Sequence, residues 1–186
     1  KKAVKNVEWR RAAERFVFPG TIVYNKIKTG AAPRAGRLDA VQALEYPLDA
    51  SAILQRKRRI RRELLQQDGL IDKKIAIVGG STVGEVKNIL ELFLLDAGIR
   101  PTFWEGGYGL YYENLVYDDG TLRSFGPDFT YIHTTGRNLC SLPEPADSPA
   151  AAEEKFPAEA ARWQALWQAA LAFGCPVIQN NFEDPD

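Results

Sequence analysis

The fold of this chain is decided by one stretch, Lys74-Ile75-Ala76-Ile77-Val78-Gly79-Gly80-Ser81-Thr82-Val83-Gly84-Glu85. Its apolar, largely β-branched run is typical of a strand buried on both faces, and Gly79-Gly80 allow a turn too tight for a side chain. A helix follows, which Ser81 or Thr82 can cap. We therefore expect a hydroxyl and free backbone N–H groups at the carboxyl end of a parallel strand, where open α/β sheets bind ligands.

Strand and helix patterns alternate from this stretch onward. Apolar spacing predicts helices over residues 83–96 and 158–173, and strands over residues 99–104, 129–134 and 175–179. Such alternation predicts an α/β protein with a three-layer α/β/α sandwich on a parallel sheet, joined by right-handed crossovers.

Composition limits the class of protein. The 186 residues are 45% hydrophobic and carry 24 basic and 24 acidic side chains, so no excess charge points to nucleic acid. No apolar run approaches the roughly 20 residues of a membrane span. Two cysteines, Cys140 and Cys175, cannot form a disulfide framework or a metal site of their own, which favours a reducing cytoplasm. We expect Cys140 to be a small buried residue.

We expect two regions. Residues 1–46 are irregular and predict a partly helical N-terminal arm, and residues 47–186 form the α/β domain. The chain has no methionine and ends soon after a predicted strand, so we expect a domain truncated at its C-terminus.

Pro47 opens a helix whose outer faces are strongly basic through Arg56-Lys57-Arg58-Arg59 and Arg61-Arg62. A solvated helix surface explains such a run. The alternative is a docking patch for an acidic partner, formed by Arg58, Arg59 and Arg62. Nucleic acid is disfavoured because no aromatic residue is interleaved with the run.

The ends of the strands bring a set of polar residues to one edge of the sheet. Ser81 can serve as a nucleophile there, with turn amides and Asn138 as oxyanion donors. The base is missing, since the single histidine, His133, lies in a strand on the same face as Tyr131 and is expected to pack there. Further candidate ligand-binding residues are Gly80, Thr82, Thr135, Gly136 and Arg137. Ser81 as a helix cap and Asn138 as a loop-stabilising amide remain open alternatives.

Four motifs in order resemble the N-terminal half of FkbH-like proteins, which belong to subfamily IIIC of the HAD superfamily. They are Glu45-Tyr46-Pro47-Leu48-Asp49, residues 75–82, Tyr131-Ile132-His133-Thr134-Thr135 with Arg137-Asn138, and Val177-Ile178-Gln179-Asn180-Asn181-Phe182-Glu183. The resemblance implies a domain with a flavodoxin-like, SGNH-hydrolase-like parallel sheet, followed by a C-terminal HAD-type phosphatase-like domain. Some members load a glyceryl unit onto an acyl carrier protein.

The resemblance also implies roles for particular residues. Gly80-Ser81-Thr82 falls on the SGNH nucleophile turn, although Gly80 replaces the usual Asp, and Gly136-Arg137-Asn138 falls on the block that supplies the oxyanion-hole Asn. The Asp-x-x-His block and the HAD motif Asp-x-Asp-x-Thr do not occur in this sequence. We therefore expect no cofactor in this part, and magnesium only in an HAD-type domain beyond it.

The sequence thus predicts an SGNH-like domain that takes part in acyl transfer, with an acyl carrier protein and an HAD-type domain as partners. This domain by itself would be weakly active or inactive. One alternative is a non-catalytic module that docks a carrier protein or another domain. A second alternative is an independent esterase, which the missing base disfavours.

Overall fold

The computed structural model describes residues 39–182. The chain divides into two units, Lys1–Gly36 and Arg37–Asp186. Most of the predicted N-terminal arm therefore lies outside the described residues. The elements of the second unit, in chain order, are α2 (Asp39–Gln42), α3 (Ala50–Leu64), β1 (Ile71–Gly79), α4 (Gly84–Asp96), β2 (Ile99–Glu105), α5 (Tyr111–Val116), α6 (Thr121–Phe125), β3 (Phe129–His133), a 3₁₀ turn (Gly136–Asn138), α7 (Pro149–Leu171) and β4 (Val177–Gln179).

The four described strands form one parallel sheet in the order β2-β1-β3-β4. The register places Ile75 of β1 between Phe103 of β2 and Phe129 of β3. After β1 the chain adds β2 on one side, then returns to add β3 on the other. The carboxyl ends of β1 and β3 therefore form the point where strand order reverses, which is where such sheets bind ligands.

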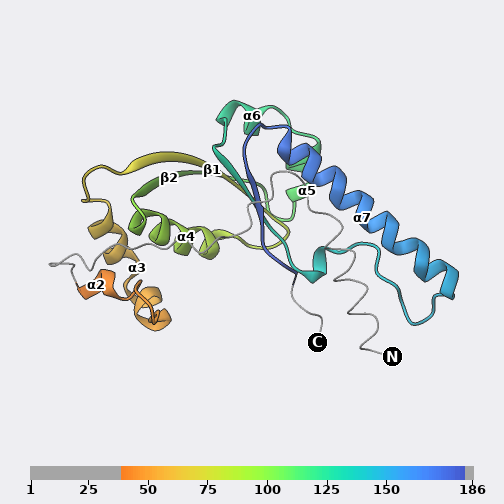
Figure 1. The fold of residues 1–186 in the computed structure, drawn as a ribbon, viewed down its shortest axis with the longest axis horizontal. Coiled ribbons are helices and arrows are strands. Elements are labelled where there is room, and N and C mark those ends of the chain that lie inside the picture. The colour runs from red at the N-terminus through yellow and green to blue at the C-terminus, as the bar shows by residue number, and fades with distance from the viewer. Residues whose placement is uncertain (1–38, 183–186) are drawn as a thin grey trace. The chain divides into compact units, whose positions relative to one another are not determined.

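Helices cover both faces of the sheet, as the apolar run of β1 predicts (Figure 1). Alternate residues of β1 point to opposite faces. Ile75 and Ile77 pack with Val83 and the α4 side, whereas Ala76 and Val78 join α5 and α7 in a second cluster. Leu166 of α7 is fully buried in that second cluster. The predicted three-layer α/β/α sandwich is confirmed.

Helix α3 packs on the outer side of α4 rather than on the sheet. Ile60 and Leu64 are fully buried against Leu92 and Leu95 of α4. Two ion pairs border this contact, with Lys57 Nζ 2.7 Å from Glu85 Oε2 and Arg61 Nε 2.8 Å from Glu91 Oε2. Part of the basic run thus holds α3 on α4.

Helix α7 is longer than the sequence predicts. The predicted start at residue 158 is wrong, because α7 begins at Pro149, with Ser148 as its N-cap and Pro157 inside the helix. Pro157 lacks the N–H that would bond one turn back and usually ends or kinks a helix. Here proline at the first helical position and the Ser148 cap, whose Oγ accepts from Ala151 N, stabilise an earlier start.

Candidate functional site

A small pocket opens at the carboxyl edge of β1 and β2. It has a volume of about 110 Å³ and is lined by Gly79, Ser81, Thr82, Val83, Glu105, Gly106, Gly107 and Tyr108. Tyr108 is 77% exposed at its mouth. An ion pair between Lys87 of α4 and Glu105 of β2 joins the two elements beside the pocket. A volume of this size suits a group of a few non-hydrogen atoms, since a liquid water occupies roughly 30 Å³.

Ser81 lines this pocket and does not cap α4. The predicted cap by Ser81 or Thr82 is wrong, because α4 begins at Gly84 after Val83, which makes no side-chain capping bond. The turn after Gly79 places both hydroxyls ahead of the N-cap position. Within residues 39–182 the Ser81 hydroxyl has no hydrogen-bond partner, and the side chain is half-buried. The hydroxyl is therefore available to a bound group.

Asn138 joins the loop after β3 to the turn after β1. Its Nδ2 donates to the Gly80 carbonyl at 3.2 Å, and its Oδ1 accepts from the Thr135 N–H at 2.9 Å. Because a carbonyl can only accept and an N–H can only donate, these two partners determine the orientation of the Asn138 amide. The Gly80 N–H in turn donates to the His133 carbonyl at 2.9 Å. A Cβ at Gly80 would collide with the Asn138 amide, so glycine is required there. The geometry shows Asn138 as a loop-stabilising amide, and its role towards a ligand stays a prediction.

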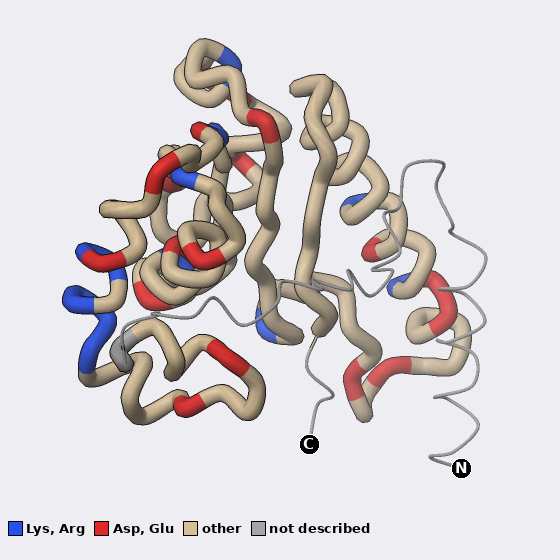
Figure 2. Tube along the Cα trace, turned by 60° about the vertical axis from the view of Figure 1, so that its left-hand side comes forward, with Lys and Arg blue, Asp and Glu red and all other residues tan. Residues whose placement is uncertain are grey.

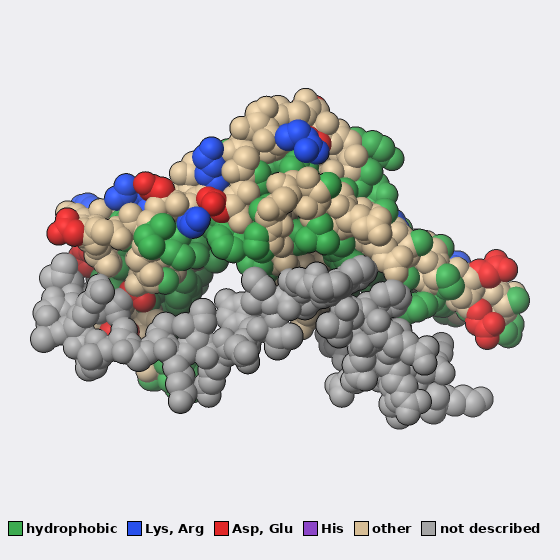
Figure 3. All heavy atoms as spheres, turned by 45° about the horizontal axis from the view of Figure 1, so that its top comes forward, with side chains coloured by type: hydrophobic (Ala, Val, Ile, Leu, Met, Phe, Trp, Pro, Cys, Tyr) green, Lys and Arg blue, Asp and Glu red, His purple; other side chains and the backbone are tan. Residues whose placement is uncertain are grey.

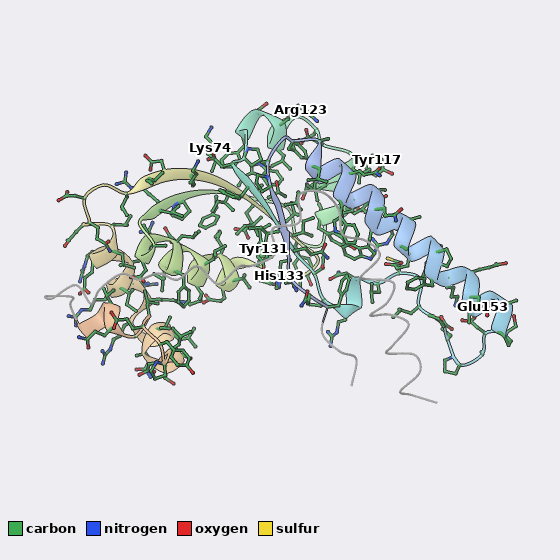
Figure 4. The ribbon with its side chains drawn as sticks, in the orientation of Figure 1. Lys74, Tyr117, Arg123, Tyr131, His133 and Glu153 are labelled. Atoms are coloured by element: carbon green, nitrogen blue, oxygen red, sulfur yellow. The ribbon has the colours of Figure 1, made fainter. Side chains whose placement is uncertain are left out.

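The other residues predicted for this edge differ in their surroundings. Thr135 and Gly136 are half-buried, whereas Arg137 is exposed in the 3₁₀ turn. His133 Nδ1 lies 3.3 Å from the hydroxyl of Tyr131 on the same face of β3, where Figure 4 shows both side chains side by side. Among the described contacts, His133 makes none with Ser81, so the site has no identified base.

A network on α7 that the sequence analysis did not identify holds the loop that carries Asn138. The Glu159 carboxylate, only 3% exposed, accepts hydrogen bonds from Arg162, Trp163 and the backbone N–H groups of Cys140 and Ser141. Burial raises the pKa of Glu159, but the bonds from Arg162, Trp163 and Cys140 outweigh burial and leave the pKa below its ordinary value. The carboxylate is therefore ionised and fully satisfied.

Arg162 extends the network to the backbone of the same loop. Its Nη2 donates to the Asn138 carbonyl at 2.6 Å and its Nη1 to the Tyr111 hydroxyl at 3.0 Å. Burial lowers the pKa of Arg162, but its bonds to Glu159 and Tyr111 hold it above its ordinary value. The signal in the sequence was a carboxylate on an apolar stripe, since Glu159 precedes Trp163, Leu166 and Ala170 at helical spacing.

The two cysteines differ in their exposure. Cys175 is buried, but Cys140 is exposed, so its predicted burial is wrong: its backbone N–H is held by Glu159 while its side chain faces outward. In the part of the chain that the structure describes, no group of three His, Cys, Asp or Glu residues could hold a metal ion. No helix among those residues is long and apolar enough to cross a membrane.

The predicted docking arginines are exposed residues of α3, in a stretch of chain where Figure 2 shows basic residues close together. Arg59 pairs with Glu63 at 2.8 Å. Arg58 and Arg62 are exposed one turn apart and have no ion pair with any residue in 39–182. Acidic side chains gather at the far end of α7, where Figure 3 shows a group of them and Figure 4 labels Glu153.

The fold is similar to that of a solved structure, the N-terminal part of the protein BF1531 from Bacteroides fragilis, which contains a phosphatase domain and is complexed with Mg. The TM-score is 0.55 and the identity 16%, over 70% of this chain and 34% of that one. The chain thus spans about a third of the length of that structure, and the likeness shows the fold alone. No protein family model matches the chain, and no curated protein matches it.

Gly80→Ala should destabilise the protein by about 1–3 kcal/mol, because the new methyl group displaces the Asn138 amide and leaves the Gly80 carbonyl and Thr135 N–H without their partner. Gly84→Ala is the matched control. Its Cβ would meet no atom within 4 Å, so it should raise stability by about 0.5–1 kcal/mol. Urea denaturation measures both. Equal effects of the two substitutions would show that Asn138 does not require Gly80.

Glu159→Gln should lower stability by about 2 kcal/mol at neutral pH, because the half-buried Arg162 loses its carboxylate. Folding lowers the pKa of Glu159 from its ordinary 4.5, so its contribution is fully present above that value and is lost as the pH falls through the lowered pKa. The urea midpoints of wild type and variant should therefore converge as the pH falls through the lowered pKa of Glu159. The control, Glu153→Gln on the exposed side of the same helix, should show no such convergence. A difference that stays constant with pH would contradict the assignment.

Proposed function

We propose that this chain contains the SGNH-like domain of an FkbH-like biosynthetic protein, and that the domain takes part in acyl transfer by holding a short acyl group in the Ser81 pocket. The observation that carries the proposal is the free hydroxyl of Ser81 in a pocket at the carboxyl edge of β1 and β2. The sequence motifs support the family. The solved protein of similar fold contains a phosphatase domain, which agrees with the domain pairing that the resemblance implies.

The size and polarity of the pocket favour a short acyl group. Pockets for nucleotides and other large ligands usually measure 300–1,000 Å³, whereas this one measures about 110 Å³. The hydroxyls of Ser81 and Thr82 can bond to a carbonyl or hydroxyl of a two- or three-carbon unit, and Tyr108 at the mouth can contact a longer carrier arm. A glyceryl unit has three carbons and hydroxyl groups, so it also fits this pocket.

The described residues give Ser81 no partner that could remove its proton. A serine hydroxyl without an adjacent base is a weak nucleophile. Asn138 is also engaged with Gly80 and Thr135 on the side where an oxyanion donor is expected. We therefore propose that the domain binds the acyl group, and that the chemistry requires residues from another domain, for which the HAD-type partner is the candidate.

A second function, docking of an acidic acyl carrier protein, is favoured by one observation. Arg58 and Arg62 present two exposed cations one turn apart, whereas Lys57 and Arg61 on the same helix are used to hold α4. Leu54, one turn before Arg58, is 55% exposed and adds an apolar contact to this row. Charges around an apolar centre are typical of transient protein interfaces.

The acyl site can be tested with acetyl-pantetheine, which carries a two-carbon acyl group on the arm of a carrier protein. Titration followed by NMR should shift the amide signals of residues 81–82 and 105–108 in a saturable way. Ser81→Ala should weaken binding about threefold to tenfold because one hydrogen bond is lost. Ser124→Ala, at an exposed serine of α6, is the control and should leave binding unchanged.

Hydrolysis of the same thioester should stay at background in both variants and in wild type. Saturable shifts that are absent, or that Ser81→Ala leaves unaltered, would contradict the acyl site. Turnover that depends on Ser81 would instead establish the esterase alternative.

Arg62→Glu should weaken binding to an acyl carrier protein about threefold to tenfold at low salt, because the reversal repels an acidic surface. The effect should shrink near physiological ionic strength, where exposed charges are screened beyond about 8 Å. Arg100→Glu, at an exposed arginine on β2, makes the same charge change elsewhere and is the control. Equal losses for the two variants would reject α3 as the docking surface.

A further inference from the structure

Helix α7 carries a buried ion pair that the proposed site does not use directly. Glu159 is 3% exposed, and its Oε1 lies 2.8 Å from Arg162 Nη2. Apolar side chains already dock this helix on the sheet, with Leu166 and Ala170 fully buried. A buried ion pair is weak evidence for stability, because desolvation offsets the attraction. The pair therefore calls for another explanation.

The hydrogen bonds of the pair end on one short loop. Glu159 Oε2 accepts from Cys140 N at 3.2 Å and Ser141 N at 2.9 Å, while Arg162 Nη2 donates to the Asn138 carbonyl at 2.6 Å. The Tyr111 hydroxyl of α5 adds a bond to the same carbonyl at 3.3 Å. The backbone from Asn138 to Ser141 is thus held from α7.

The side chain of Asn138 connects this loop to the turn that carries Ser81. Its amide bonds the Gly80 carbonyl and the Thr135 N–H, so Asn138 is held through its backbone by α7 and through its side chain by the two loops. Gly80 immediately precedes Ser81. A shift of the Asn138 backbone therefore moves the amide that fixes the turn on which Ser81 stands.

We infer that Glu159 and Arg162 are positioning residues for the Ser81 turn and act through Asn138. This inference rests on the proposed function in one respect: it takes the Ser81 turn to be the place where a ligand binds. Arginine is required at 162 because its planar fork reaches Glu159, Tyr111 and the Asn138 carbonyl at once, whereas a lysine ammonium is a point charge that cannot span the three.

The test uses the full chain without ligand and follows amide hydrogen exchange by NMR. In Arg162→Lys, the amides of Gly80 and Thr135 should exchange about tenfold faster, and the signal of Ser81 should shift. The Gly106 amide, which bonds the Ile77 carbonyl at the neighbouring strand end, is the internal control and should keep its rate. Arg123→Lys, at an exposed arginine of α6, should change none of these amides.

Coupling through Asn138 is tested by combining substitutions. In an Asn138→Ala background, Arg162→Lys should no longer alter Gly80 or Ser81, because the connection is already broken. Tyr111→Phe removes one hydroxyl from the network without changing charge, and it should produce a smaller shift in the same signals. This milder variant keeps the test valid if Arg162→Lys unfolds.

Two results would overturn the inference. One is a change confined to residues 139–141 and α7, with Gly80 and Ser81 unaffected. The other is an effect on Gly80 that persists in the Asn138→Ala background. Since no ligand is present, either result leaves the acetyl-pantetheine titration to decide the proposed function separately.

Discussion

The Asn138 amide is the interaction on which the candidate site depends. It bonds the Gly80 carbonyl and the Thr135 N–H, and so connects the carboxyl ends of β1 and β3 where strand order reverses. The contact is possible because Gly80 has no Cβ. An unpaired polar group at this depth costs free energy comparable to a lost hydrogen bond. The turn, the loop and the pocket are therefore parts of one hydrogen-bonded unit.

Helix α7 holds this unit through an ion pair, and desolvating the two charges costs free energy. Apolar packing of the helix on the sheet would not carry that cost. A buried carboxylate and guanidinium must be desolvated, and the structure meets that cost by satisfying every donor and acceptor that faces the loop. Glu159 and Arg162 thus fix the position of the loop at residues 138–141 relative to helix α7. A mobile loop would not keep Asn138 within bonding distance of Gly80.

The pocket at Ser81 and the charged surface of the domain are formed by different elements. The pocket at Ser81 is small and nearly neutral, because Lys87 and Glu105 pair beside it. The basic charges of α3 divide into two groups: Lys57 and Arg61 hold α4, whereas Arg58 and Arg62 face solvent. A net charge of zero therefore conceals a locally basic surface on α3.

The sequence by itself determined the fold class and the edge at which the site lies. The apolar run of β1 is predictive because a strand buried on both faces needs it, and Gly79-Gly80 marks the turn because only glycine fits there. The absence of a Ser81 cap on α4, the exposure of Cys140 and the Glu159–Arg162 network were decided only by the tertiary structure. Each depends on which distant group lies nearby, as when Asn138 meets Gly80 across 58 positions. Local periodicity reports the faces of helices and strands, but it carries no information about which loops meet.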